Sequence, residues 1–268
     1  MKGRLLIRLV PIAIALFVAF MQRCSSEKIV NEAGRTVRLG LNPQQEAQLG
    51  LQAYQQTLST NRTITSGEQY DMVKRCAQRL EAATGDAGRD FDWKVSLVVS
   101  DQVNAFCLPG GKICVYTGII PVAQSEAGLA VVMGHEIAHA TNHHGAERVL
   151  QEKTANTLLT GANFSLGGMD PAQHRQIMGL IGAGAQLGYI LPFSRDHESE
   201  ADSVGLRYMA RAGYDPTEAV RFWQRMMQMS KGAPPQFLST HPAHETRIQR
   251  LKAELPKAME IYRAASGR

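Results

Sequence analysis

The stretch that most constrains the fold is Val131–Asn142, which reads VVMGHEIAHATN and contains the pattern H-E-x-x-H. His135 and His139 are four residues apart, so on a helix both imidazoles lie on one face and can bind a single ion. Neutral imidazole suits a tetrahedral zinc ion. Glu136 follows the first histidine, where its carboxylate can reach a metal-bound water and act as a general base. The apolar surroundings indicate a buried helix, so the pattern predicts a zinc site; the alternative is a helix whose histidines bind protein groups.

The residues after this motif exclude one known arrangement of ligands. The longer pattern H-E-x-x-H-x-x-G-x-x-H would require glycine at position 142 and histidine at position 145, but the chain has Asn142 and Gly145. His143 and His144 lie beyond His139 at the expected end of the helix. We interpret both as polar end residues rather than as metal ligands.

A better source of a third ligand is the downstream stretch Ser194–Gly205, which reads SRDHESEADSVG. Glu198 and Asp202 are four residues apart, so they share one face of a helix. Glu198 would complete a site of two histidines and one glutamate and leave the fourth position to water. Asp202 would accept the spare ring N–H of a ligating histidine. Glu200 lies on another face of the helix, and we do not expect it to bind the metal.

Together these motifs resemble the zinc metallopeptidases related to HtpX, BepA and the CAAX prenyl proteases. Two further stretches carry the resemblance, NAFCLPGGKICVYTG at Asn104–Gly118 and STHPAHETRI at Ser239–Ile248. It extends from about Asn42 to Leu251, and within the group the chain is most similar to exported, single-domain bacterial members. The resemblance implies an α+β fold, a mostly helical gluzincin metallopeptidase domain with a small antiparallel sheet.

The resemblance also implies roles for residues outside the two motifs. The hairpin at 104–118 would carry an edge strand above the metal, with Asn104 among the residues that bind an extended substrate. His241 would lie near one zinc ion per chain, where it could bind the metal at rest or donate to the oxyanion during catalysis. Arg247 would position His241 or contact the substrate. The implied activity is endoproteolytic cleavage of unfolded or extended segments of envelope and membrane-associated proteins, as in protein quality control.

Two other functions remain open on the sequence. One is a chaperone-like binding module whose zinc is structural or gates access, and the other is a zinc hydrolase of a non-peptide amide, such as one in peptidoglycan. A structural zinc has four protein ligands. Three ligands together with Glu136 as a base instead favour an open, catalytic site.

The first residues indicate export. A basic start precedes an apolar run at Leu9–Met21, which predicts a signal peptide or membrane anchor at 1–24. The run is short for a membrane span, which needs about 20 residues. Cys24 followed by two serines resembles a lipoprotein cleavage site, but Arg23 departs from that pattern. We expect a periplasmic protein held at the membrane by an inner-membrane anchor or, less favoured, a lipid. A linker at 25–41 and the metallopeptidase domain at 42–268 would follow.

The composition is consistent with this organisation. The 268 residues are 44% hydrophobic and 20% charged, enough apolar residues for one core. The net charge of +5 is spread along the chain, which suits an anionic membrane surface. No basic patch interleaved with aromatic residues is present, so we expect no nucleic-acid partner.

Local patterns predict the elements and leave one pairing open. If Gly110 and Gly111 form a two-residue turn, Cys107 lies opposite Cys114, where a disulfide and two reduced cysteines are both compatible with the sequence. The uncharged stretch Ile177–Phe193 predicts a buried or interfacial helix over the cleft rather than a span. Strands are expected at 36–39, 93–99 and within 104–118, and helices at 42–58, 68–83, 125–143, 145–159, 195–212, 216–229 and 243–255.

Overall fold

The computed structural model describes residues 2–166, 193–229, 235–242 and 245–267. The contacts divide the chain into two compact units. The first contains residues 1–29, 36–42 and 145–191, and the second contains residues 30–35, 43–144 and 192–268.

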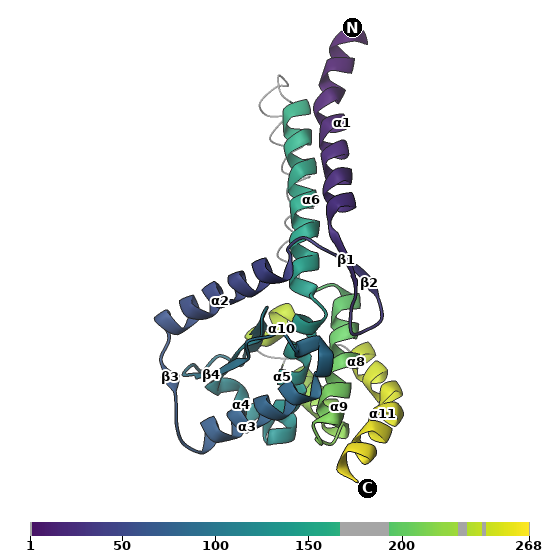
Figure 1. The fold of residues 1–268 in the computed structure, drawn as a ribbon. Helices are drawn as coiled ribbons and strands as arrows, with labels where there is room; N and C mark the ends of the chain where they lie inside the picture. Colours follow the sequence, from purple (N-terminus) through teal and green to yellow (C-terminus); the bar gives the residue numbers. More distant parts are fainter. Residues whose placement is uncertain (1, 167–192, 230–234, 243–244, 268) are drawn as a thin grey trace. The chain divides into compact units, whose positions relative to one another are not determined.

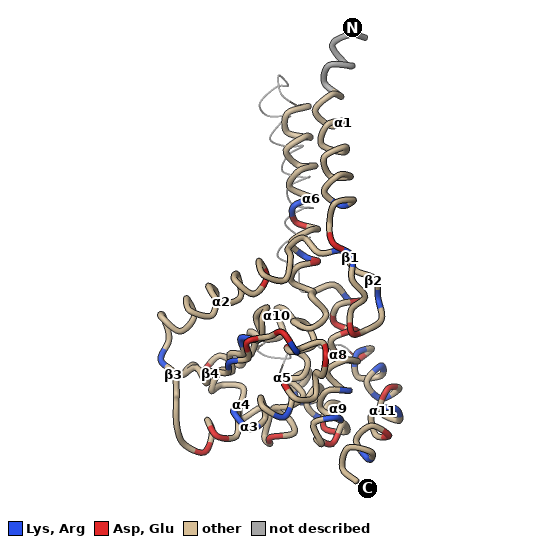
Figure 2. The backbone as a smooth tube through the Cα atoms, in the orientation of Figure 1, with Lys and Arg blue, Asp and Glu red and all other residues tan. Residues whose placement is uncertain are grey.

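The first unit is built on two long helices, α1 (Lys2–Ser25) and α6 (His144–Ser165), together with β2 (Thr36–Leu39) and most of β1 (Glu27–Val30). The two helices lie side by side (Figure 1), and Gly161 permits their close approach, because a Cβ there would lie 2.3 Å from the Cβ of Ala15. Charged residues of α6 gather near its N-terminal end (Figure 2). Several large apolar side chains between Leu9 and Met21 are exposed. Among the described residues, no helix is long and apolar enough to span a membrane.

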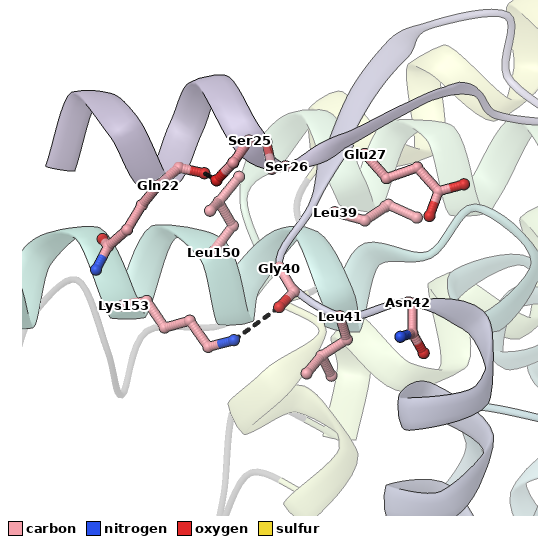
Figure 3. Close-up of a pocket in the computed structure, with 10 residues that line it drawn as sticks. All are labelled: Gln22, Ser25, Ser26, Glu27, Leu39, Gly40, Leu41, Asn42, Leu150 and Lys153. Atoms are coloured by element: carbon pink, nitrogen blue, oxygen red, sulfur yellow. Dashed lines mark hydrogen bonds between the residues drawn. The ribbon is translucent and has the colours of Figure 1, made fainter. Parts of the chain in front are cut away.

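A surface cavity of about 400 Å³ lies within the first unit, between the C-terminal end of α1, β2 and α6 (Figure 3). Its lining is partly polar and includes Gln22 and Ser25. At its edge, Lys153 Nζ donates a hydrogen bond to the carbonyl of Gly40 (2.7 Å). None of the predicted metal ligands lines this cavity.

The second unit is organised around α5 (Glu126–Thr141), which is buried along almost its whole length. It packs most extensively against α8 (Arg195–Arg211) and also against α3 (Glu68–Ala83), as Figure 1 shows. The apolar stripe of α3, which includes Val73, Cys76 and Leu80, faces this core. Further α-helices among the described residues of this unit are α2 (Pro43–Thr60), α4 (Ile120–Ala123), α9 (Thr217–Met229), α10 (Gln236–Thr240) and α11 (Glu245–Ser266).

A four-stranded sheet contributes the remaining wall of this core. Its order is β3 (Thr63–Ile64), β4 (Lys94–Val98), β6 (Lys112–Tyr116) and β5 (Ala105–Leu108). The sheet is mixed, because β4 and β6 run parallel while the other two pairs are antiparallel. The edge strand β5 packs against α5. The predicted mostly helical α+β fold with a small sheet is confirmed, but the four-stranded sheet is mixed rather than wholly antiparallel.

The predicted pairing of Cys107 with Cys114 is wrong by one residue. The loop between β5 and β6 contains three residues, Pro109 to Gly111, so Cys107 pairs with Ile113, and Cys114 with Phe106. Successive side chains of a strand point to opposite faces. The two cysteines therefore lie on opposite faces of the sheet, in different apolar clusters, and both are free thiols. This geometry excludes a disulfide between them.

Most predicted helices are present. The bounds of α3 agree with the prediction, and those of α8 differ from it by one residue. The last helix continues eleven residues beyond its predicted end, to Ser266, although it contains Pro256. The short helix α10 was not predicted. The predicted helix at Ile177–Phe193 lies outside the described residues, apart from Phe193.

Candidate metal centre

Two capped helices present the residues of the predicted metal site. Ser125 caps α5 by accepting a hydrogen bond from the backbone N–H of Gly128 (3.0 Å), and Ser194 caps α8 in the same way. The helices cross where Gly134 and Gly205 meet, and a Cβ at Gly205 would lie only 2.9 Å from the backbone of α5. The absence of side chains at this crossing lets α5 and α8 bring their polar residues together.

Four buried side chains converge between these helices. Potential ligand atoms of His135, His139, Glu198 and His241 all lie within 4.8 Å of one another. The Nε2 atoms of His135 and His139 are 3.1 Å apart, and His241 Nδ1 lies 2.9 Å from Glu198 Oε1. The structure thus brings together the three predicted ligands and places His241 beside them. Three imidazoles and one carboxylate are a donor set that suits zinc.

Glu136 lies at the edge of this cluster with one oxygen unsatisfied. Its Oε1 is buried and makes no hydrogen bond within the described part of the chain, although His241 Nε2 lies 3.3 Å away. Burial raises the pKa of Glu136 to about 7, an effect that Glu198 reinforces and that His241 and Arg247 oppose. A carboxylate of near-neutral pKa can both accept and return a proton. The unsatisfied Oε1 of Glu136 and the four potential ligands beside it fit a site that holds a metal ion and a metal-bound water.

Asp202 contacts the first histidine of the motif. Its Oδ1 lies 3.0 Å from Nδ1 of His135, on the side of the ring away from His139. A hydrogen bond between these atoms would fix the tautomer in which Nε2 of His135 is free to bind a metal. The structure places Asp202 beside His135, and its role in orienting that histidine stays a prediction.

Of the two roles expected for Arg247, contact with the substrate does not fit its position, whereas its guanidinium does donate a hydrogen bond to the carbonyl of Pro242 next to His241 (3.3 Å). Arg247 is 1% exposed, and its guanidinium donates to Glu198 Oε2 (2.9 Å) and to Asp202 Oδ1 (2.5 Å). It also lies 3.3 Å from the ring centre of Trp223. Arg247 is buried behind the carboxylates and holds them in place, so it is not open to a substrate.

The carboxylate of Glu198 is held ionised by its neighbours. Burial alone would raise its pKa, but the charge of His135 and hydrogen bonds from His135, His139 and His241 outweigh it. The pKa of Glu198 therefore lies well below its ordinary value. An ionised carboxylate is the form that binds a metal.

His144 begins α6 and lies outside the group of four potential ligands, as expected of a helix-end residue, but its burial against that group was not expected. The preceding His143 adopts φ 57°, which turns the chain so that the ring of His144 returns toward α5. His144 is fully buried, and its Nδ1 lies 2.9 Å from Nδ1 of His139. Its other nitrogen, Nε2, lies 3.1 Å from Glu200 Oε2. His143, in contrast to His144, lies apart from the cluster. Its Nδ1 lies 2.6 Å from Glu46 Oε2.

Asn104 stands at the start of the edge strand rather than in the cluster. Its side-chain oxygen accepts a hydrogen bond from the N–H of Ala105 (3.0 Å), and its carbonyl accepts one from Tyr116. Further along β5, the backbone of Cys107 lies near the carboxylate of Glu136 and lowers its pKa. The edge strand therefore adjoins the metal centre, and substrate binding by Asn104 stays a prediction.

The chain is similar in sequence to known proteins over the region that contains this site. The profile of peptidase family M48 matches residues 67–255. The mitochondrial metalloendopeptidase OMA1 of Schizosaccharomyces pombe is 36% identical over 190 residues, which are 69% of this chain and 53% of that protein. The beta-barrel assembly-enhancing protease of Escherichia coli K12 is 28% identical over 221 residues, 81% of this chain and 44% of that protein. The chain spans about half the length of these relatives. It belongs to peptidase family M48.

Proposed function

We propose that this chain is a zinc-dependent endopeptidase whose metal is held by His135, His139 and Glu198. The observation that carries the proposal is the convergence of these three side chains beside Glu136, whose buried Oε1 lacks a hydrogen bond among the described residues. The printed names of the relatives, a metalloendopeptidase and a protease, support the same activity.

The chain's own residues would divide the work of hydrolysis. Zinc bound at this site would supply Lewis-acid activation of water and of the scissile carbonyl. Nε2 of each histidine and the carboxylate of Glu198 would hold the ion. Glu136 would accept the proton of the attacking water and return it to the leaving amine.

His241 would assist at the position left open by the three ligands. Its ring stacks on Phe237, with ring centres 4.6 Å apart, and its Nε2 points toward Glu136. The imidazole would bind the metal at rest and donate a hydrogen bond to the developing oxyanion when substrate enters. We expect the second role to dominate, so His241→Ala should lower kcat by roughly 10²–10³-fold. Unchanged kcat and KM would reject both roles.

The proposed substrates are unfolded or extended segments of proteins of the bacterial envelope. Strand β5 pairs with β6 on one side, and on its other side the described residues include no paired strand. An extended peptide can add to such an edge through its main chain. The exposed apolar side chains of α1 support attachment to a membrane surface, where the chain would meet membrane-associated substrates.

The test is hydrolysis of a labelled, unfolded protein such as reduced casein by the zinc-loaded chain and by Glu136→Gln. The variant keeps the size of the side chain but removes the base, so zinc should stay bound while turnover falls by roughly 10²–10⁴-fold. Near wild-type cleavage by Glu136→Gln would contradict the mechanism. Binding of casein by the zinc-loaded wild type without cleavage would instead favour the chaperone-like module.

A further inference from the structure

The buried His144 and the partly buried Glu200 form a pair that has no part in the chemistry proposed above, yet His144 contacts a metal ligand. Nδ1 of His144 lies 2.9 Å from Nδ1 of His139, and Nε2 of His144 lies 3.1 Å from Glu200. These contacts connect three side chains in series, from His139 in the metal cluster through His144 to Glu200. None of the three is more than partly exposed.

Only one arrangement of hydrogens satisfies all the hydrogen bonds among His139, His144 and Glu200 when His139 binds a metal. Its Nε2 faces Glu198 and His135, so Nε2 must carry the free lone pair and Nδ1 the hydrogen. Nδ1–H of His139 then donates to an unprotonated Nδ1 of His144. The hydrogen of neutral His144 is consequently on Nε2, where it donates to the carboxylate of Glu200.

Glu200 is itself held by two residues of the turn between β1 and β2. Asn31 Nδ2 donates to Glu200 Oε2 (2.7 Å), and the guanidinium of Arg35 pairs with the same carboxylate. The orientation of the His144 ring is restricted on one face, because the ring of His197 stacks on it with ring centres 4.3 Å apart. The carboxylate and the imidazole therefore have little freedom to move away from His139.

We propose that His144 and Glu200 are positioning residues that fix the ring of His139 in the tautomer and orientation required for metal binding. Asp202 contacts His135 at the corresponding nitrogen, so each histidine of the motif has its own partner behind it. The inference rests on the proposed zinc site. His144 and Glu200 would therefore affect the affinity for the metal and would not contact the substrate.

The experiment compares three substitutions of His144 by their zinc dissociation constants, measured by competition with a fluorescent chelator. The amide oxygen of asparagine can replace Nδ1 as the acceptor for His139, whereas the amide nitrogen of glutamine replaces Nε2 as the donor to Glu200. His144→Ala and His144→Gln should each weaken zinc binding by about 10–100-fold. His144→Asn should retain more affinity than His144→Gln, a ranking that general loss of packing would not produce.

The matched control is His143→Asn, because the neighbouring His143 pairs with Glu46 and asparagine tolerates its positive φ. This control should bind zinc as the wild type does. A further variant, Glu200→Gln, keeps the size of the side chain and removes its charge, so it tests the pair should the alanine variant fail to fold. It should also weaken zinc binding.

Two results would overturn the inference. One is a zinc dissociation constant for folded His144→Ala, or for Glu200→Gln, equal to that of the wild type. The other is equal affinity of the asparagine and glutamine variants. Absence of zinc binding in the wild type would instead refute the proposed function. The visible spectrum of the Co²⁺-loaded protein gives a second readout, because a turned His139 changes the coordination geometry.

Discussion

The crossing of α5 and α8 predicts the effect of adding one methyl group to Gly205. A Cβ at this position would lie 2.9 Å from the carbonyl carbon of Gly134 and from the backbone nitrogen of His135. Ordinary contacts begin at 3.4 Å, so the two helices would have to separate locally by about 0.5 Å. The obstructing atoms are backbone and cannot turn aside. The shift would fall between His135 on α5 and Glu198 on α8.

The magnitude follows from two opposing terms. Alanine is favoured over glycine within a helix by roughly 0.8–1.0 kcal/mol. Overpacking a closed contact costs about 1–3 kcal/mol. Gly205→Ala should therefore lower the free energy of unfolding by about 0–2 kcal/mol, which corresponds to a fall in Tm of up to roughly 8 °C. Zinc affinity should fall by roughly 10-fold or more, because site geometry must hold to within about 0.5 Å.

Thermal unfolding of the metal-free protein and chelator competition measure the two effects separately. Gly134→Ala is the comparison, because a Cβ there meets the carbonyl oxygen of Gly205 at the more tolerable distance of 3.1 Å. Gly134→Ala should lose less stability and less zinc affinity than Gly205→Ala. If Gly205→Ala proves at least as stable as the wild type and binds zinc with unchanged affinity, the close crossing does not control the site.

Three further changes test other parts of the structure. Glu198→Ala removes a ligand and should release the zinc, which elemental analysis of the purified variant would detect; full occupancy would reject Glu198 as a ligand. Arg247→Ala leaves two buried carboxylates without their cation and should cost about 3–5 kcal/mol in unfolding experiments; a stability equal to that of the wild type would show that the guanidinium is dispensable. Oxidation of the folded protein should leave Cys107 and Cys114 unlinked, because they lie on opposite faces of the sheet; a peptide containing both in a disulfide would refute the observed register.

Local sequence patterns were sufficient to predict the elements that carry the metal ligands. Apolar residues at helical spacing marked α3, and Ser125 followed by Glu126 marked where α5 begins. The i, i+4 spacings of His135 with His139 and of Glu198 with Asp202 placed each pair on one face. These features depend on a few neighbouring residues, so the sequence contains them directly.

The parts that were missed depend on contacts between distant segments. His144 reads as a polar residue at a helix end, and only the turn at His143 directs its ring toward His139. Arg247 was expected to position His241 or contact the substrate, and its contacts with Glu198 and Asp202 appear only once the distant segments are brought together. The register of β5 and β6 depended on a loop of three residues instead of two, a difference that the Gly-Gly pair alone does not reveal.

The most direct test of the account is anomalous diffraction at the zinc absorption edge from crystals of the full chain grown with zinc. We predict one strong peak per chain, about 2.0–2.2 Å from Nε2 of His135, Nε2 of His139 and the carboxylate of Glu198. Glu136 should lie beside this peak without binding it. A peak elsewhere, or a zinc enclosed by four protein ligands even with a peptide bound, would contradict the assignment of this centre as an open catalytic site.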